Sequence, residues 1–186
     1  MGTDKEQRII EARLRLRARF LERMATTPSV SDDRPQGTGP VNRHGMPRLP
    51  VGQHETKKWP VLDLGVHPEI ELDQWCLTVD GAVQQPIRVG WNDFQALETI
   101  EDVQDFHCVT TWSRFDLRLR GVRCSTVCAL AGLSPAATHV LCHAYDGYTT
   151  NLRLEEALKD DVLLAYEWDD KPLPREHGGP VRMVTP

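Results

Sequence analysis

The chain has 186 residues, of which 40% are hydrophobic and 26% charged, a length that fits one domain with its own core plus an appendage. Its net charge of −5 argues against a nucleic-acid-binding protein, which is usually basic, and no apolar stretch is long enough to span a bilayer or resembles a secretory signal. Five cysteines without paired spacing predict reduced thiols and therefore a cytoplasmic protein.

Residues 1–27 form a charged N-terminal segment, and a helix is predicted over residues 3–25. Thr3 and Glu6 match a capping box, and one helical stripe is apolar: Ile10, Leu14, Leu21 and Met24. The segment is locally basic because of Arg13, Arg15, Arg17, Arg19 and Arg23. We expect a solvated helix that packs on the body or on a neighbouring subunit of a homo-oligomer; the alternative is a docking surface for an acidic partner.

Residues 28–60 are rich in proline and glycine, which predicts an extended connector without regular structure. Its downstream end carries His54 and Glu55 just before an apolar stretch. A loop of this kind could line a functional site, and a plain surface loop is the alternative.

Residues 61–186 alternate short apolar runs with turns, which predicts strands over residues 75–79, 103–109, 138–144, 148–152, 162–168 and 181–185. Two short helices are expected, one capped by Asn92 or Asp93 and one running from Ser125 to Leu130 and closed by Gly132. Strands outnumber helices and tight turns join them, so the predicted class is α+β with a β-rich mixed sheet.

Cys108 is the residue with the strongest chemical signal, because it lies at the end of a predicted strand in the sequence DFHCVTTWS. It could be an inert buried thiol, a nucleophile, or a metal ligand. His107 is a poor base for it, since neighbours on a strand point to opposite faces. Cys108 could be the only protein ligand of a metal if an organic cofactor supplies further sulfurs.

A zinc site is the competing interpretation, with Cys124, Cys128, His139, Cys142 and His143 as candidate ligands. Cys142 should alternate away from both histidines on its strand, and the chain has no Cys-x-x-Cys pair. We therefore expect the three cysteines to be small core residues.

A second signal lies near the C-terminus, where His177 and Arg182 flank a Gly-Gly-Pro turn. Glycines allow close approach of the backbone to a ligand, and the turn can direct imidazole and guanidinium toward one polyanionic group.

Four motifs occur in order: Asp105–Ser113, Asp146–Thr150, Leu163–Ala165 and Lys171–Arg182. Together they resemble the molybdopterin-binding domain of the sulfite oxidase family, nearest to its small bacterial members without haem. The likeness runs from about residue 51 to residue 186.

The resemblance implies a molybdenum–molybdopterin cofactor and transfer of an oxygen atom to or from a small substrate. Cys108 would be the protein thiolate on molybdenum, beside the two dithiolene sulfurs of one pterin. His177 and Arg182 would hold the pterin and its phosphate, and His54 and Glu55 would touch the pterin. The chain has no haem-binding motif, so electrons would pass to or from a separate partner.

The chain also departs from the family pattern. Thr110 stands at the position of a substrate-pocket acid in methionine-sulfoxide reductases, and Ala144 replaces a hydroxyl that contacts the cofactor there. Arg114 and Arg118, which could bind an anionic substrate, are expected to be surface charges. Family members continue past Pro186 into a lysine-containing segment, so we expect a truncated domain or one that holds cofactor differently. The alternative function is a cofactor-free remnant that acts as a scaffold or binding module.

Overall fold

The computed structural model describes residues 36–61 and 67–185, together with some positions of the N-terminal stretch. The chain divides into two units, Met1–Gln36 and Gly37–Pro186. In the first unit, the described residues before position 36 are all helical, the conformation predicted there: Arg8, Glu11, Leu14, Arg15, Ala18, Arg19 and Glu22. The other residues of the predicted cap, apolar stripe and basic set lie outside the described residues: Thr3, Glu6, Ile10, Arg13, Arg17, Leu21, Arg23 and Met24.

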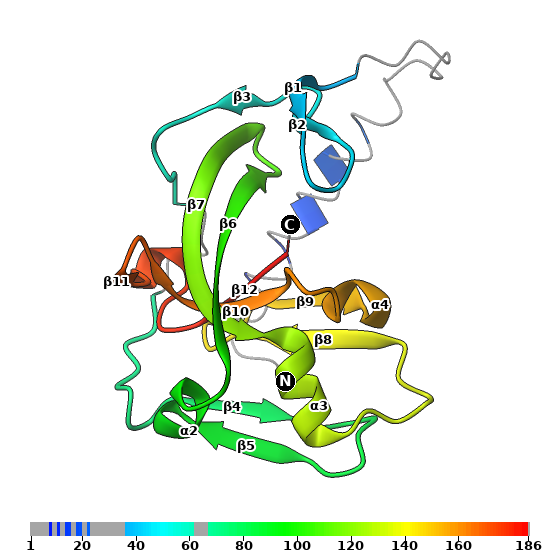
Figure 1. The fold of residues 1–186 in the computed structure, drawn as a ribbon, viewed down its shortest axis with the longest axis vertical. Helices are drawn as coiled ribbons and strands as arrows, with labels where there is room; N and C mark the ends of the chain where they lie inside the picture. The colour runs from blue at the N-terminus through cyan, green and yellow to red at the C-terminus, as the bar shows by residue number, and fades with distance from the viewer. Residues whose placement is uncertain are drawn as a thin grey trace. The chain divides into compact units, whose positions relative to one another are not determined.

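The second unit is built on a six-stranded mixed sheet (Figure 1). Its strands are β3 (His54–Glu55), β6 (Thr99–Cys108), β7 (Trp112–Arg123), β10 (Leu163–Trp168), β11 (Lys171–Pro172) and β12 (Arg182–Val184). β6 and β7 form a long antiparallel hairpin, β10 pairs antiparallel with β7, and β11 and β12 pair antiparallel with β10. β3 is parallel to β7 and makes the sheet mixed. The predicted α+β class with a mixed, β-rich sheet is confirmed.

Three two-stranded sheets and short helices surround this sheet (Figure 1). The strand pairs are β1 (Thr38–Val41) with β2 (Pro47–Leu49), β4 (Cys76–Val79) with β5 (Ile87–Gly90), and β8 (His139–His143) with β9 (Thr149–Arg153). The helices are α2 (Trp91–Gln95), α3 (Cys124–Ala131), α4 (Leu154–Ala157) and a 3-10 turn, η1 (Arg175–His177). None of the helices in the described part of the chain is long and apolar enough to cross a membrane.

The prediction of a connector without regular structure is wrong for its downstream half, which contains β1, β2 and β3. Glycines there have specific backbone roles, since Gly45 lies in the turn between β1 and β2 and Gly39 lies in β1 where its register shifts, both with positive φ. Two arginines fix the β1–β2 hairpin to β6: Arg43 bonds Asp102 at 2.9 Å, and Arg48 bonds Asp105 at 2.6 Å.

The strand β7 was not predicted, although it is the longest in the sheet. Its pattern has the two-residue period of a strand, because Leu117 and Leu119 are buried while Arg118 and Arg120 are not.

The predicted helix starts are also wrong. Helix α2 begins at Trp91, so neither Asn92 nor Asp93 is its cap, and Ser125 lies inside α3, whose N-cap is Arg123. The predicted end of α3 is confirmed, since Gly132 follows it with φ of 65°.

The buried side chains form three clusters. The first lies on β6, β7 and β10 and contains Trp59, Cys108, Trp112, Leu117, Leu119 and Leu163. The second surrounds α2 and contains Trp75, Phe94, Val122 and Tyr166, and the third lies beside α3 and contains Cys124, Cys128, Ala157 and Val162. The core positions predicted for Cys124 and Cys128 are confirmed, and Cys142 is half-buried.

Candidate functional site

Cys108 is the last residue of β6 and is 8% exposed. A tight turn follows it, closed by a hydrogen bond of 3.0 Å from the Thr111 amide to the Cys108 carbonyl. Within this turn the Thr110 hydroxyl lies 3.1 Å from the Cys108 sulfur. The site thus begins at a buried thiol under the tip of the β6–β7 hairpin.

The strand register shows which side chains share the face of Cys108. Residues that pair directly across an antiparallel ladder point to the same side, and Cys108 pairs with Trp112 while Phe106 pairs with Arg114. Phe106 and Trp112 stack with ring centroids 5.6 Å apart. Cys108 therefore faces an aromatic cluster that also contains an arginine.

His107 and its partner Ser113 point to the opposite face. The Ser113 hydroxyl donates to Gln53 Oε1 at 2.7 Å, so His107 Nδ1, 2.8 Å from that hydroxyl, must be the donor of the second contact. Burial lowers the pKa of His107, which favours the neutral ring. His107 is thus a structural residue and not a base for the Cys108 thiol.

Trp59 is the centre of the aromatic cluster. Its ring stacks on His177 with centroids 4.1 Å apart and an interplanar angle of 12°, and meets Trp168 edge-on at 4.8 Å. It also contacts Phe106 at 5.6 Å. These rings form an apolar wall that keeps water from the sulfur.

The C-terminal turn brings His177 and Arg182 to the same cluster. Arg182 Nη1 donates to the His177 carbonyl at 2.8 Å, and the guanidinium carbon lies 5.3 Å from the Phe106 ring centre and 5.7 Å from that of Trp59. Gly178 has a φ of 94°, a conformation that favours glycine. The His177 imidazole and the Arg182 guanidinium therefore both lie against the ring of Trp59.

Arg182 is a half-buried cation without a counter-charge among the residues that the structure describes. Burial lowers its pKa, whereas a negative charge on Cys108 would raise it. Within the same described residues, its Nε and the indole Nε1 of Trp168 are buried and have no hydrogen-bond partner. Buried donors are normally paired, so each of these two N–H groups is suited to donate to an anionic group.

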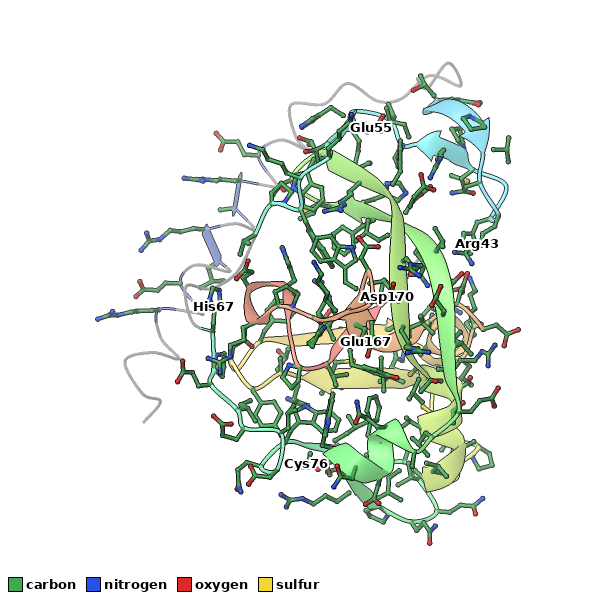
Figure 2. The ribbon with its side chains drawn as sticks, turned by 60° about the vertical axis from the view of Figure 1, so that its left-hand side comes forward. Arg43, Glu55, His67, Cys76, Glu167 and Asp170 are labelled. Carbon is green, nitrogen blue, oxygen red and sulfur yellow. The ribbon has the colours of Figure 1, made fainter. Side chains whose placement is uncertain are left out.

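His54 and Glu55 are separated by the sheet. Both lie on β3, where His54 pairs with Trp112 and Glu55 pairs with Ser113. His54 is thus on the Cys108 face, while Glu55 is on the other face and lines a hollow of about 630 Å³ with Arg48. Figure 2 shows Glu55 beside the upper end of the long hairpin. Of the predicted pterin contacts, the fold groups His177 and Arg182 with Cys108 but not Glu55.

Residues 64–186 match the family model described as the oxidoreductase molybdopterin binding domain. The chain belongs to this family. The predicted resemblance to sulfite oxidase-like molybdopterin proteins is therefore confirmed.

The chain matches relatives in this molybdopterin-binding family over different shares of their length. The oxidoreductase YuiH of Bacillus subtilis is 41% identical over 140 residues, which cover 75% of this chain and 71% of YuiH. The catalytic subunit of the protein-methionine-sulfoxide reductase MsrP of Gluconobacter oxydans is 29% identical over 60% of this chain and 41% of its own length. Human mitochondrial sulfite oxidase is 39% identical over 79 residues, 37% of this chain and 14% of that protein.

A solved structure shares the fold. The sulfane dehydrogenase SoxCD of Paracoccus pantotrophus superposes with a TM-score of 0.59 at 20% identity, covering 64% of this chain and 36% of that one. The chain thus spans well under half of SoxCD, MsrP and sulfite oxidase.

The site residues fit the family's cofactor. Molybdopterin carries a phosphate and sulfur donors. The site offers the buried thiol of Cys108 and two buried N–H donors, Arg182 Nε and Trp168 Nε1, that have no partner among the described residues. A thiolate is a soft ligand suited to a transition metal, and arginine is suited to phosphate.

Sequence reasoning missed the aromatic residues Trp59 and Trp168 and the link made by Gln53. Gln53 Nε2 donates to the Cys108 carbonyl at 3.1 Å and so fixes the connector to the cysteine segment. The position of Trp59 shortly after His54 could have indicated that it belongs to the site. For Trp168 the only indication was its position just before the C-terminal motif. Gln53 had no local signal at all.

Other candidate groups lie away from the site. Cys124 and Cys128 have sulfurs 4.0 Å apart, and Cys142 bonds Met183. No group of three or more His, Cys, Asp or Glu in the described ranges is arranged to hold a metal ion. Arg118 forms ion pairs with carboxylates, the surface role expected for it, but Arg114 lies over the Trp168 ring at 4.4 Å and belongs to the aromatic cluster.

Proposed function

We propose that this protein is a molybdenum-dependent oxidoreductase that transfers an oxygen atom to or from a small substrate. The observation that carries the proposal is the buried thiol of Cys108 near Arg182, whose buried Nε lacks a partner among the described residues. The names of its relatives support the class, since YuiH, MsrP and sulfite oxidase are all named for redox reactions.

Each residue has a separate role in this proposal. Cys108, as a thiolate, would be the protein ligand of molybdenum, while Arg182 and His177 would hold the pterin and its phosphate. His54 lies on the same face and would contact the pterin from β3. When bound, the cofactor supplies the two-electron oxygen-transfer chemistry, and the rings of Trp59, Phe106 and Trp168 limit the access of water to it.

The electron balance requires a partner. When a substrate gains an oxygen atom from water, two protons and two electrons are released, and the reverse reaction consumes them. The sequence carries no haem motif, so we propose a separate electron acceptor or donor.

All five cysteines are free, which supports a reducing compartment and hence a cytoplasmic location.

The test uses protein produced in a host that makes molybdopterin. Molybdenum and the fluorescent pterin derivative are quantified, and two reactions are assayed with artificial electron carriers: sulfite oxidation to sulfate, and methionine sulfoxide reduction to methionine. The wild type should contain molybdenum and catalyse one of them, and Cys108→Ser should lose metal and activity. Wild-type protein without molybdenum, pterin or activity would favour the cofactor-free binding module.

A further inference from the structure

Within the described residues, the Thr110 hydroxyl is the side-chain group that forms a hydrogen bond with the Cys108 sulfur, at 3.1 Å. The resemblance assigned this position to the substrate pocket. Its geometry points elsewhere: we propose that Thr110 is a positioning residue whose hydroxyl donates to the Cys108 sulfur and weakens its electron donation to the metal. This inference rests on the proposed role of Cys108 as a metal ligand.

The backbone of the turn holds Thr110 in place over the sulfur. Thr111 has a φ of 75°, which is unfavourable for a β-branched residue and marks a position fixed by its surroundings. The Thr111 amide bonds the Cys108 carbonyl at 3.0 Å, and the Thr111 hydroxyl donates to the Thr110 carbonyl at 2.6 Å. Gln53 holds the same Cys108 carbonyl from the connector side.

Burial explains why this hydroxyl matters. The Cys108 side chain is buried, whereas Val109 next to it is 87% exposed and Thr110 is also exposed. Thr110 is thus an exposed residue whose hydroxyl contacts a buried sulfur. On the interior side the sulfur faces aromatic rings, so Thr110 is the hydroxyl donor available to it within the described residues.

The direction of the hydrogen bond follows from the state of the sulfur. A free thiol can donate to the hydroxyl or accept from it, but a thiolate or a metal-bound sulfur has no proton and can only accept. Thr110 must then be the donor, and the contact becomes a hydrogen bond to a charged acceptor. Hydrogen bonds to a ligand sulfur reduce its electron donation and stabilise the reduced state of the metal.

Three variants isolate this effect. Thr110→Val keeps the β-branched shape and removes the hydroxyl, and Thr110→Ser restores a hydroxyl. Thr111→Val is the matched control, because it removes a hydroxyl from the same turn that bonds a carbonyl rather than the sulfur. Each loaded protein is assayed for molybdenum content and for the midpoint potential of the metal by redox titration followed by electron paramagnetic resonance.

Thr110→Val should retain wild-type molybdenum content while its midpoint potential falls. At a fixed solution potential, its ratio of oxidised to reduced metal should rise about threefold to tenfold, the effect of one ordinary hydrogen bond. Thr110→Ser and Thr111→Val should remain close to the wild type. Equal potentials in fully loaded wild type and Thr110→Val would overturn this inference alone, whereas a wild type without molybdenum would refute the proposed function and this inference with it.

Discussion

Replacing Arg182 by methionine should weaken cofactor binding without weakening the metal-free fold. The change removes the guanidinium and keeps an unbranched, apolar side chain. It loses the hydrogen bond to the His177 carbonyl, worth about 1–3 kcal/mol for a charged donor, and contacts with the Phe106 and Trp59 rings worth roughly 1 kcal/mol.

These losses are offset by the removal of a buried charge. Desolvation of an uncompensated ion costs several kcal/mol, and among the described residues no carboxylate pairs with Arg182. The free energy of unfolding of metal-free Arg182→Met should therefore lie within about 1 kcal/mol of the wild type, or above it. Molybdenum content after expression in a cofactor-producing host should fall sharply.

Urea unfolding followed by tryptophan fluorescence measures the free energy of unfolding of the metal-free proteins. The matched control is Leu119→Ala, a residue of the same cluster that is 1% exposed, and it should lose about 2–5 kcal/mol. If metal-free Arg182→Met lost as much stability as this control, the guanidinium would be a structural cation, and the argument for an anion site would be wrong.

Three further predictions concern stability and the other cysteines. Burial lowers the pKa of His107 and of His177, so below about pH 6.5 the unfolded chain takes up protons that the folded chain does not. The free energy of unfolding should therefore decrease as the pH falls through this range. In urea titrations, a variant with both His107→Gln and His177→Gln should show a flatter dependence of this free energy on pH, and an unchanged slope would contradict the prediction. Gly121→Ala should lower the free energy of unfolding by about 1–3 kcal/mol or more, because the added Cβ would lie 2.4 Å from the Leu164 carbonyl oxygen. Gly90→Ala is the control in thermal melts, because its added Cβ would meet open space. Cys142→Ala should leave molybdenum content unchanged, and a loss of metal in that variant would place part of the site near α3.

The part of the site that is local in sequence was predictable. Cys108 lies inside one short motif, and His177 and Arg182 lie inside another, so each motif could be identified without knowledge of the fold. The Gly-Gly-Pro turn also predicted that the imidazole and the guanidinium can be directed toward one anionic group, which stays a prediction.

The aromatic wall could not be predicted in the same way. Trp59 lies in a proline-rich stretch far upstream of Cys108, and its contacts arise from tertiary packing. His54 and Glu55 must point to opposite faces because they are neighbours on a strand, but which of them shares the face of Cys108 depends on the register of β3 with β7, which a two-residue strand does not encode. The strand β7, in contrast, could have been predicted, because its leucines and arginines alternate with the two-residue period of a strand.

The central claim is that the Cys108 sulfur is a ligand of molybdenum. X-ray absorption at the molybdenum edge of the purified holoprotein counts the sulfur atoms bound to the metal. We expect one more sulfur ligand in the wild type than in the metal-loaded fraction of Cys108→Ser. An equal sulfur count in the two proteins, with full metal content in both, would contradict it.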